Sequence, residues 1–302
     1  MSTPLNELPI RRLTTADLTS CADLSEDRGW PREEHKWGLL LTAGTGYGID
    51  DPSGKGLTGA CVVTSYGPGP GPSTAAGPGL AAIGMVLVAE RHSRQGVGRR
   101  LMTHVLAEHG ATPLTLHATP YGQPLYEELG FTTVGRAEMV SGHFRAPGPA
   151  AGSSNGAAAG TTTRPATADD LPAILRLDAE VFGLDRTHMI TRLPAFADQL
   201  RVAESDGVLT GYAAAWPNMA THVIGPLIAR DTETAKALIA SLAAHTDRPL
   251  RTDIDVRHEE LLNWLKANGL APIAFNAVMS LSIPTLPGDW ARRFAPLTVA
   301  AG

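Results

Sequence analysis

The sequence predicts an α/β protein in which α+β layers form two domains, each a twisted mixed sheet flanked by helices. Segments with the apolar spacing of strands alternate with segments that have the spacing of helices, a pattern typical of helix-covered sheets. At 302 residues the chain is longer than one compact core usually needs. A run of Gly, Ala, Pro, Ser and Asn near the middle indicates a flexible joint.

The predicted domains are residues 1–144 and 161–302, joined by the linker 145–160. Short matches between them recur at a spacing of 152 residues near the start of each domain and at 141 further on, so the second domain lacks 11 residues in between. Such repetition indicates an internal duplication. The matches are Thr15-Ala16-Asp17 with Thr167-Ala168-Asp169, Gly59 with Gly211, and Ile83-Gly84 with Ile224-Gly225.

The elements of the first domain follow from the period of its apolar residues. Alternating or continuous apolar runs predict strands, and a period of three to four residues predicts helices. In chain order we expect a strand near Ile10, helices after Asp17 and after Pro31, strands around Tyr47, at Leu57–Ser65 and at Leu80–Val88, a helix at Val97–His109, a strand at Leu114–His117, a helix at Pro124–Leu129 and a strand after Phe131.

Composition and charge narrow the possible functions. The formal net charge is −5, so nucleic-acid binding is not expected, whereas a cationic small substrate is compatible. Cys21 and Cys61 are too few for a disulfide framework or a cysteine zinc site, and we expect no metal. Apolar stretches such as Ile83–Ala89 are too short to span a bilayer. We therefore expect a cytoplasmic protein, a monomer or a homodimer, that does not engage a membrane.

The segment after the strand Leu80–Val88 has the features of an anion site. A turn containing Gly96 and Gly98 begins a helix, and the free N–H groups of a helix start favour a phosphate that glycines allow to approach. Guanidinium groups bind phosphates well, although the same groups also occur on solvated surfaces. Four surround this turn: Arg91, Arg94, Arg99 and Arg100.

Two common nucleotide-binding motifs do not fit this chain. A dinucleotide-binding fingerprint requires a third glycine where Leu101 stands. A P-loop requires a glycine where Ile49 stands and a hydroxyl residue after the lysine of Gly54-Lys55-Gly56. Neither nucleotide fold is expected.

A series of motifs instead follows in order through the first domain. They are the apolar strand Met85–Val88, Ser93-Arg94-Gln95-Gly96-Val97-Gly98 at the start of a helix, the strand Leu114–Thr119, and Leu125-Tyr126-Glu127-Glu128-Leu129-Gly130-Phe131. This order resembles the GNAT acetyltransferase superfamily over roughly Ile10–Phe144. The sequence departs from the family pattern at Ser93, which replaces an Arg or Gln, and at Thr119, which replaces an Asn. We expect Arg94 to compensate for the first departure.

The resemblance implies that the first domain binds acetyl-CoA. The strand would hydrogen-bond the pantetheine arm through its backbone, and the amides of the following turn would hold the pyrophosphate. The residues expected to bind acetyl-CoA are Val86, Leu87, Val88, Ser93, Arg94, Gln95, Gly96, Val97, Gly98 and Arg99.

Two residues are candidates for proton transfer. By its position in the motif, Tyr126 would protonate the departing thiolate, because a phenol of pKa about 10 is a reasonable donor to a thiolate. An amine acceptor must lose a proton to react, and the strand Leu80–Val88 holds no carboxylate that could take it. His117 on the neighbouring strand, or a water relay, is the expected proton acceptor.

The acceptor is expected to be a small-molecule primary amine that receives the acetyl group directly. Asp27, Trp30 and His35 lie in the region that lines the acceptor pocket in this superfamily, and acidic and aromatic groups suit an amine. In the second domain the equivalent helix start has acids and no glycines, so we expect a degenerate GNAT-like domain without a cofactor. The alternatives are a protein or peptide acceptor, and a non-catalytic acetyl-CoA sensor.

Overall fold

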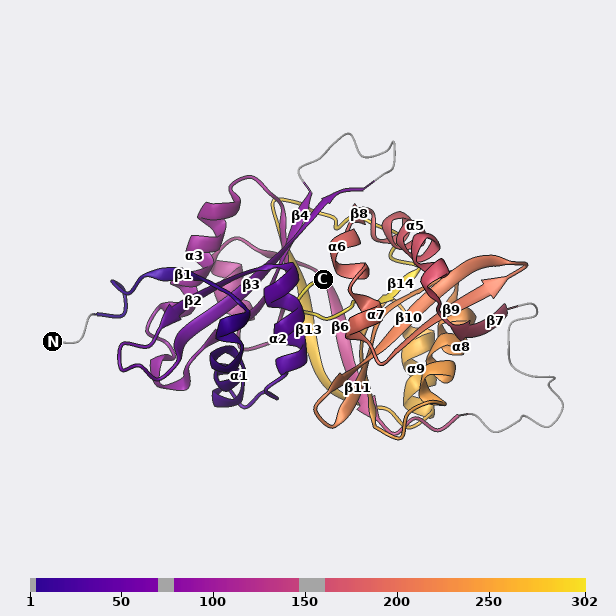
Figure 1. The fold of residues 1–302 in the computed structure, drawn as a ribbon. Coiled ribbons are helices and arrows are strands. Elements are labelled where there is room, and N and C mark those ends of the chain that lie inside the picture. Colours follow the sequence, from indigo (N-terminus) through magenta and orange to yellow (C-terminus); the bar gives the residue numbers. More distant parts are fainter. Residues whose placement is uncertain (1–3, 70–78, 147–160) are drawn as a thin grey trace.

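The computed structural model describes residues 4–69, 79–146 and 161–302 (Figure 1). Every element predicted for the first domain is present. Apart from Arg145 and Ala146, the predicted linker lies outside the described residues. The elements of the first half are β1 (Ile10–Leu13), η1 (Thr15–Asp17), α1 (Leu18–Asp27), α2 (Glu34–Ala43), β2 (Thr45–Asp50), β3 (Leu57–Pro68), β4 (Leu80–Val88), η2 (Glu90–His92), α3 (Val97–His109), β5 (Leu114–Ala118), α4 (Gln123–Glu128) and β6 (Thr132–Gly142).

The second half repeats this order with short additions. Its elements are β7 (Thr161–Pro165), η3 (Ala168–Asp170), α5 (Leu171–Phe182), β8 (Leu184–Asp185), α6 (Thr187–Ile190), α7 (Leu193–Phe196), β9 (Gln199–Ser205), β10 (Val208–Asn218), β11 (Thr221–Ala229), α8 (Thr232–Ala243), β12 (Leu250–Asp255), α9 (Glu259–Ala267), β13 (Ala271–Leu281) and β14 (Arg293–Ala295).

The start of each half is built from the same hydrogen bonds. Thr14 and Asp17 form a capping box at η1, and Thr167 and Asp170 form one at η3. In both halves an arginine six positions before the aspartate forms a 2.7 Å ion pair with it. These equivalent residues are 153 apart, one more than the sequence match at 15 and 167 indicates. The repeat is therefore present, but the alignment of that first match was wrong by one residue.

The two halves exchange the long strands β6 and β13, which follow α4 and α9. β13 from the second half lies between β5 and β6 of the first, and β6 in turn lies between β13 and β12. β6 pairs antiparallel with both neighbours, for example Ala137 with Asn276 and Asp255. The two predicted sheets are consequently one continuous sheet, with β6 and β13 at its centre (Figure 1).

Helices cover both faces of this sheet and define three cores. In the first half, α3 packs on one face, where Leu101 joins Ile83 in a buried cluster. In the second half, α8 and α9 pack on an equivalent face. The opposite faces of both halves share one core between them, which includes Trp37 from α2 and Trp216 from β10. The halves are thus joined by packing as well as by strand exchange.

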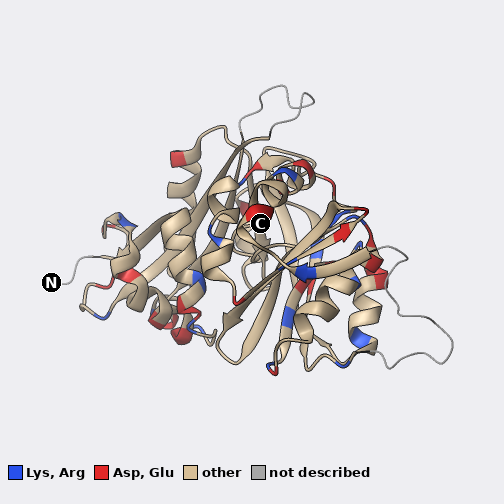
Figure 2. Ribbon diagram, turned by 45° about the vertical axis from the view of Figure 1, so that its right-hand side comes forward, with Lys and Arg blue, Asp and Glu red and all other residues tan. Residues whose placement is uncertain are grey.

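Positions of Lys and Arg and positions of Asp and Glu are spread along both halves (Figure 2). No helix in the described part of the chain is long and apolar enough to cross a bilayer.

Candidate active site

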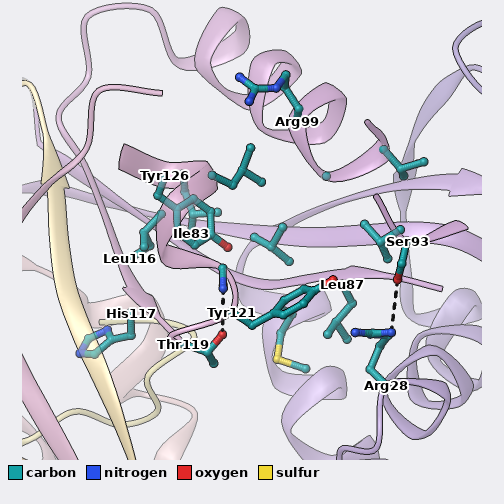
Figure 3. Close-up of a pocket in the computed structure, with 18 of the residues that line it drawn as sticks. Arg28, Ile83, Leu87, Ser93, Arg99, Leu116, His117, Thr119, Tyr121 and Tyr126 are labelled. Carbon is teal, nitrogen blue, oxygen red and sulfur yellow. Dashed lines mark hydrogen bonds between the residues drawn. The ribbon is translucent and has the colours of Figure 1, made fainter. Parts of the chain in front are cut away.

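The site begins where two parallel strands separate. β4 and β5 pair over three residues, from Ala81 with Leu114 to Ile83 with Leu116. Beyond this point β4 bulges, because Met85 adopts a φ of 53° and the register with β3 shifts. The strands diverge there and leave the β4 backbone unpaired on its β5 side among the described strands. The gap opens into a cavity of about 1040 Å³ (Figure 3).

The start of α3 lies at this cavity with its amides free. Gly96 precedes the helix at a φ of 81°, and no side chain caps the first turn. The first intrahelical bond is donated by the Arg100 amide to the Gly96 carbonyl, so the N–H groups before it have no helical acceptor. A Cβ added to Gly96 would have no heavy atom within 4 Å. This helix start is open to a ligand.

The four arginines predicted to surround the turn point in different directions. Arg94 and Arg99 line the cavity, and Arg99 also pairs with Glu128 across to α4. Arg91 instead pairs with buried Asp51 at 2.5 Å. Arg100 donates to backbone carbonyls of the N-terminal segment. The predicted convergence of four guanidinium groups was therefore wrong, since only two of the four face the cavity.

The remaining predicted acetyl-CoA residues gather at one place, with one exception. The Gln95 side chain donates to the Arg91 carbonyl at 3.1 Å and does not line the cavity. Those that line it are Val86, Leu87, Val88, Ser93, Arg94, Gly96, Val97, Gly98 and Arg99.

Tyr126 is held in the cavity wall by α4. Its side chain is almost fully buried and packs edge-on against Phe131 at 6.1 Å between ring centroids. Gly122 gives it room, because a Cβ there would lie 3.1 Å from the tyrosine ring. Burial, with a smaller effect of Cys61, raises the pKa of Tyr126 well above its usual value. The phenol is accordingly neutral at physiological pH and can act as a donor.

His117 lies on β5 at the other wall of the cavity (Figure 3). Burial, together with the positive charge of Arg293, lowers the pKa of His117 to about 4, against a weaker opposing effect of the Val299 carbonyl. The imidazole is therefore neutral at pH 7. Its Nδ1 is buried without a hydrogen-bond partner among the described residues.

The three predicted acceptor residues separate in the structure. Trp30 lines the cavity with 37% of its surface exposed. Asp27 instead accepts a hydrogen bond from the Glu90 amide at 2.6 Å. His35 contacts the Phe196 carbonyl at 2.6 Å and stacks on that ring, so it belongs to the junction between the halves. The sequence analysis missed the cavity residues Arg28 and Tyr121.

The segment after β14 carries the second half into the first. Its Ala300 packs so closely on Gly84 that a Cβ there would lie 2.2 Å from the Ala300 carbonyl oxygen. The adjacent Ala301 carbonyl accepts a hydrogen bond from Tyr66. Trp216 holds the segment from the other side, by donating to the Leu297 carbonyl at 3.2 Å. The second half therefore contributes backbone next to the bulged strand of the cavity.

The equivalent place in the second half is closed. β11 and β12 also pair over three residues and then separate, but β14 pairs with β11 beyond that point, at Leu227 and Ile228. The helix start is also occupied, because the Asp231 carboxylate caps α8 by accepting from the Thr234 amide at 2.8 Å. When Gly269-Leu270 is aligned with Gly130-Phe131, buried Leu265 stands at the place of Tyr126.

Comparison with known proteins agrees with this geometry. Residues 75–146 and 174–295 each match an acetyltransferase (GNAT) domain family. An uncharacterized N-acetyltransferase, YitH of Bacillus subtilis, is 30% identical over 237 residues, which cover 77% of each chain. The chain belongs to the GNAT N-acetyltransferase family.

Solved structures share this arrangement of two halves. A putative acetyltransferase from Pyrococcus horikoshii superimposes with a TM-score of 0.75 at 16% identity, over 98% of this chain and 96% of that one. A tandem GNAT protein from the clavulanic acid biosynthesis pathway gives a TM-score of 0.64 at 14% identity, over 92% and 100%. Such likenesses support the tandem fold. Membership of the family makes the protein an acyltransferase and implies acetyl-CoA as its co-substrate.

No cluster of three or more histidine, cysteine or acidic side chains in the described ranges is arranged to hold a metal ion.

Proposed function

We propose that the first half transfers the acetyl group of acetyl-CoA directly to a primary amine of a small molecule, and that the second half binds no co-substrate. The observation that carries this proposal is the contrast at the two helix starts. The one at Gly96 is uncapped beside an open cavity, whereas the one at Thr232 is capped by Asp231 beside a filled groove.

The cavity offers groups for each part of the co-substrate. The pyrophosphate would accept hydrogen bonds from the amides at Val97–Arg99, with the positive end of the helix dipole and Arg94 adding charge complementarity. The pantetheine arm would pair with the unpaired β4 edge at Val86–Val88, as an added strand does. The thioester would then lie near Ile83 and Tyr126, which both line the cavity (Figure 3) and belong to one buried cluster.

In the reaction the amine nitrogen attacks the thioester carbonyl. A carbon–nitrogen bond forms and the carbon–sulfur bond breaks. The thiolate receives a proton from Tyr126, and the proton that the nitrogen loses restores the phenol, directly or through water. Because burial raises the pKa of Tyr126, the phenol stays protonated until the thiolate develops.

His117 is the proposed hydrogen-bond acceptor for the amine or for an intervening water. Its lowered pKa keeps the ring neutral, so Nδ1 is free to accept. The same low pKa makes the ring a weak base, and this favours the water relay for the final removal of the proton.

Calorimetry with acetyl-CoA, followed by thiol release over a panel of amines, tests the proposal. We expect one binding site per chain and thiol release that depends on an amine. If acetyl-CoA binds but neither small nor peptidic amines are acetylated, the result would favour a non-catalytic acetyl-CoA sensor. If only peptides are acetylated, the acceptor is a peptide or protein. Absence of binding at millimolar acetyl-CoA would refute the proposal.

A further inference from the structure

The charge of the cavity does not match a site built only for a cation. Its described lining contains three charged side chains, all arginines, and no carboxylate. The acids of the α1–α2 region are engaged elsewhere: Asp27 binds the Glu90 amide, and Asp23 and Glu26 pair with Arg32 at 2.5 and 3.0 Å. An amine that enters this cavity therefore meets positive charge. The lining arginines are Arg28, Arg94 and Arg99.

These arginines lie on two different faces of β4. Val86 and Val88 pack with α3 on the face where the helix start is open. Met85 and Leu87 pack with α1 and α2 on the opposite face. In Figure 3, Arg99 and Arg28 lie on opposite sides of Leu87. Arg99 thus belongs to the face assigned to the pyrophosphate. Arg28 follows α1 on the other face, where the acceptor would enter, and it reaches the edge of the turn only at Ser93.

Arg28 is held in a fixed position with its guanidinium toward the cavity. It follows the last turn of α1, its side chain is 18% exposed, and it donates to Ser93 Oγ at 3.4 Å. Its guanidinium carbon also lies 5.8 Å from the centroid of the Tyr121 ring. The guanidinium is partly desolvated and oriented, which strengthens its interaction with an anion.

The present partner of Arg28 can be exchanged. Glu90 forms an ion pair with it, but the Glu90 side chain is 67% exposed. Ion pairs with one partner in water contribute little stability, so a ligand carboxylate can replace Glu90 at small cost. Beside Arg28, Trp30 and Tyr121 expose 37% and 64% of their surfaces in the cavity wall. Exposed aromatic rings at a pocket supply contact area for the body of a ligand.

We propose that the acceptor is an amine that also carries a carboxylate, and that Arg28 binds this carboxylate while Trp30 and Tyr121 contact the carbon chain. This inference rests on the proposed acetyl transfer and names its substrate class. Arg28 is then a specificity-determining residue, because it selects among amines and takes no part in moving protons.

Acceptor pairs that differ only in a carboxylate test this assignment. Suitable pairs are lysine and cadaverine, ornithine and putrescine, and tryptophan and tryptamine. We expect kcat/KM to favour the carboxylate-bearing member of the pairs that react. Arg28→Gln should raise KM for that member about 10- to 100-fold, the usual effect of losing a hydrogen bond to a charged group. The KM of the decarboxylated partner and the affinity for acetyl-CoA should not change.

Arg32→Gln provides the matched control. Arg32 is four residues away, pairs with acids on the surface and does not line the cavity. The Arg32→Gln variant should have an unchanged KM for both members of a pair. Thermal unfolding of the Arg28 and Arg32 variants checks that they fold. Arg28→Lys should recover part of the loss, because it keeps the charge but not the planar donor pair.

Two outcomes would overturn the inference while acetyl transfer stands: a preference for the decarboxylated amines, or an Arg28→Gln variant that loses acetyl-CoA affinity alone. The second would place Arg28 on the co-substrate. If no amine in the panel is acetylated although acetyl-CoA binds, the proposed function itself fails, and the inference fails with it.

Discussion

The two halves share one fold, yet the place where one is open is filled in the other. In the first half a left-handed glycine leaves the start of α3 uncapped, and β4 has an unpaired edge. In the second half Asp231 caps α8, and β14 pairs with β11. The second half thus satisfies, with its own chain, the backbone groups that the first half leaves free. Under the proposed function, this internal replacement explains why only one of the two halves binds the co-substrate.

Stability favours the closed arrangement. An N-cap carboxylate stabilises a helix by about 1 kcal/mol relative to alanine and by roughly a few tenths of a kcal/mol relative to glycine, and a buried backbone group without a partner is unfavourable. The first half forgoes both contributions at Gly96 and along β4. Free donors at this position are consistent with selection for a ligand, since folding alone gains nothing from them.

An acid at the start of α3, where the second half has one at the start of α8, should have the largest effect on acetyl-CoA binding. Gly96→Asp places a carboxylate at the start of α3 and should weaken acetyl-CoA binding at least about 100-fold, through charge repulsion and the strain of a side chain at a φ of 81°. Calorimetry measures the affinity. Gly110→Asp is the matched control, because Gly110 lies at the far end of the same helix with a φ of 54° and open space around it. Unchanged affinity in the Gly96 variant would remove the pyrophosphate from this turn.

Replacing Tyr126, whose counterpart in the second half is not a tyrosine, should have the next largest effect. Tyr126→Phe should lower kcat about 100-fold while the acetyl-CoA affinity stays the same, because the thiolate loses its donor and the groove keeps its shape. Tyr47→Phe is the control, since Tyr47 is buried in the same core and does not line the cavity. Turnover at the wild-type rate in the Tyr126 variant would exclude the phenol from the reaction.

A third difference between the halves is the titratable residue at one equivalent position of the sheet, which is His117 in the first half. The folded pKa of His117, about 4, lies below its unfolded value of about 6.5, so the unfolded state binds more protons between these values. Stability should therefore fall as pH drops from 6.5 to 4, by at most about 3 kcal/mol from this residue. His117→Gln should flatten that part of a denaturation series. An identical pH profile in the variant would show that the imidazole is not desolvated.

The register places Asp253 of β12 where His117 stands on β5. Burial raises the pKa of Asp253, so its contribution has the opposite sign: stability is lost as pH rises from about 3.8. Asp253→Asn should remove that loss, whereas His117→Gln should not affect it.

Removing the N-cap of α8 in the second half should have the smallest effect, and this effect should be on stability. Asp231→Ala removes the cap of α8 and should lower the free energy of unfolding by about 1 kcal/mol, seen as a lower thermal midpoint. Titration should still give one acetyl-CoA per chain, because β14 continues to fill the groove. A second stoichiometric site in this variant would mean that the cap alone excludes the ligand.

Local signals predicted the open half well. The glycines at 96 and 98 and the apolar stripe of α3 specify a helix start within a few residues of sequence, and Leu125–Phe131 likewise specifies α4 and its tyrosine. The acids at the start of α8 predicted a helix without a cofactor, and the structure adds that one of them, Asp231, caps the helix.

Long-range placement could not be predicted from these signals. Arg100 sits beside Arg99 in sequence, but it turns toward the Leu5 and Leu8 carbonyls, which no pattern near it reveals. The sequence around Asp27 gives no sign of a partner for its carboxylate, because the Glu90 amide that donates to it lies 63 residues further along the chain. Nothing local distinguishes β6 from β13 as a partner for β5, because each is a long strand that follows a helix, α4 or α9, in its own half.

The exchange of β6 and β13 bears on how the protein is made. β5 is complete at Ala118, but the strand that lies next to it begins at Ala271, so the ribosome must add roughly half of the chain before that edge can be covered. Until then the nascent first half presents an open strand edge, the kind of surface that recruits other chains. A gene fragment encoding residues 1–144 lacks β13, so either β6 folds back onto β5 in its place or the fragment aggregates through this edge.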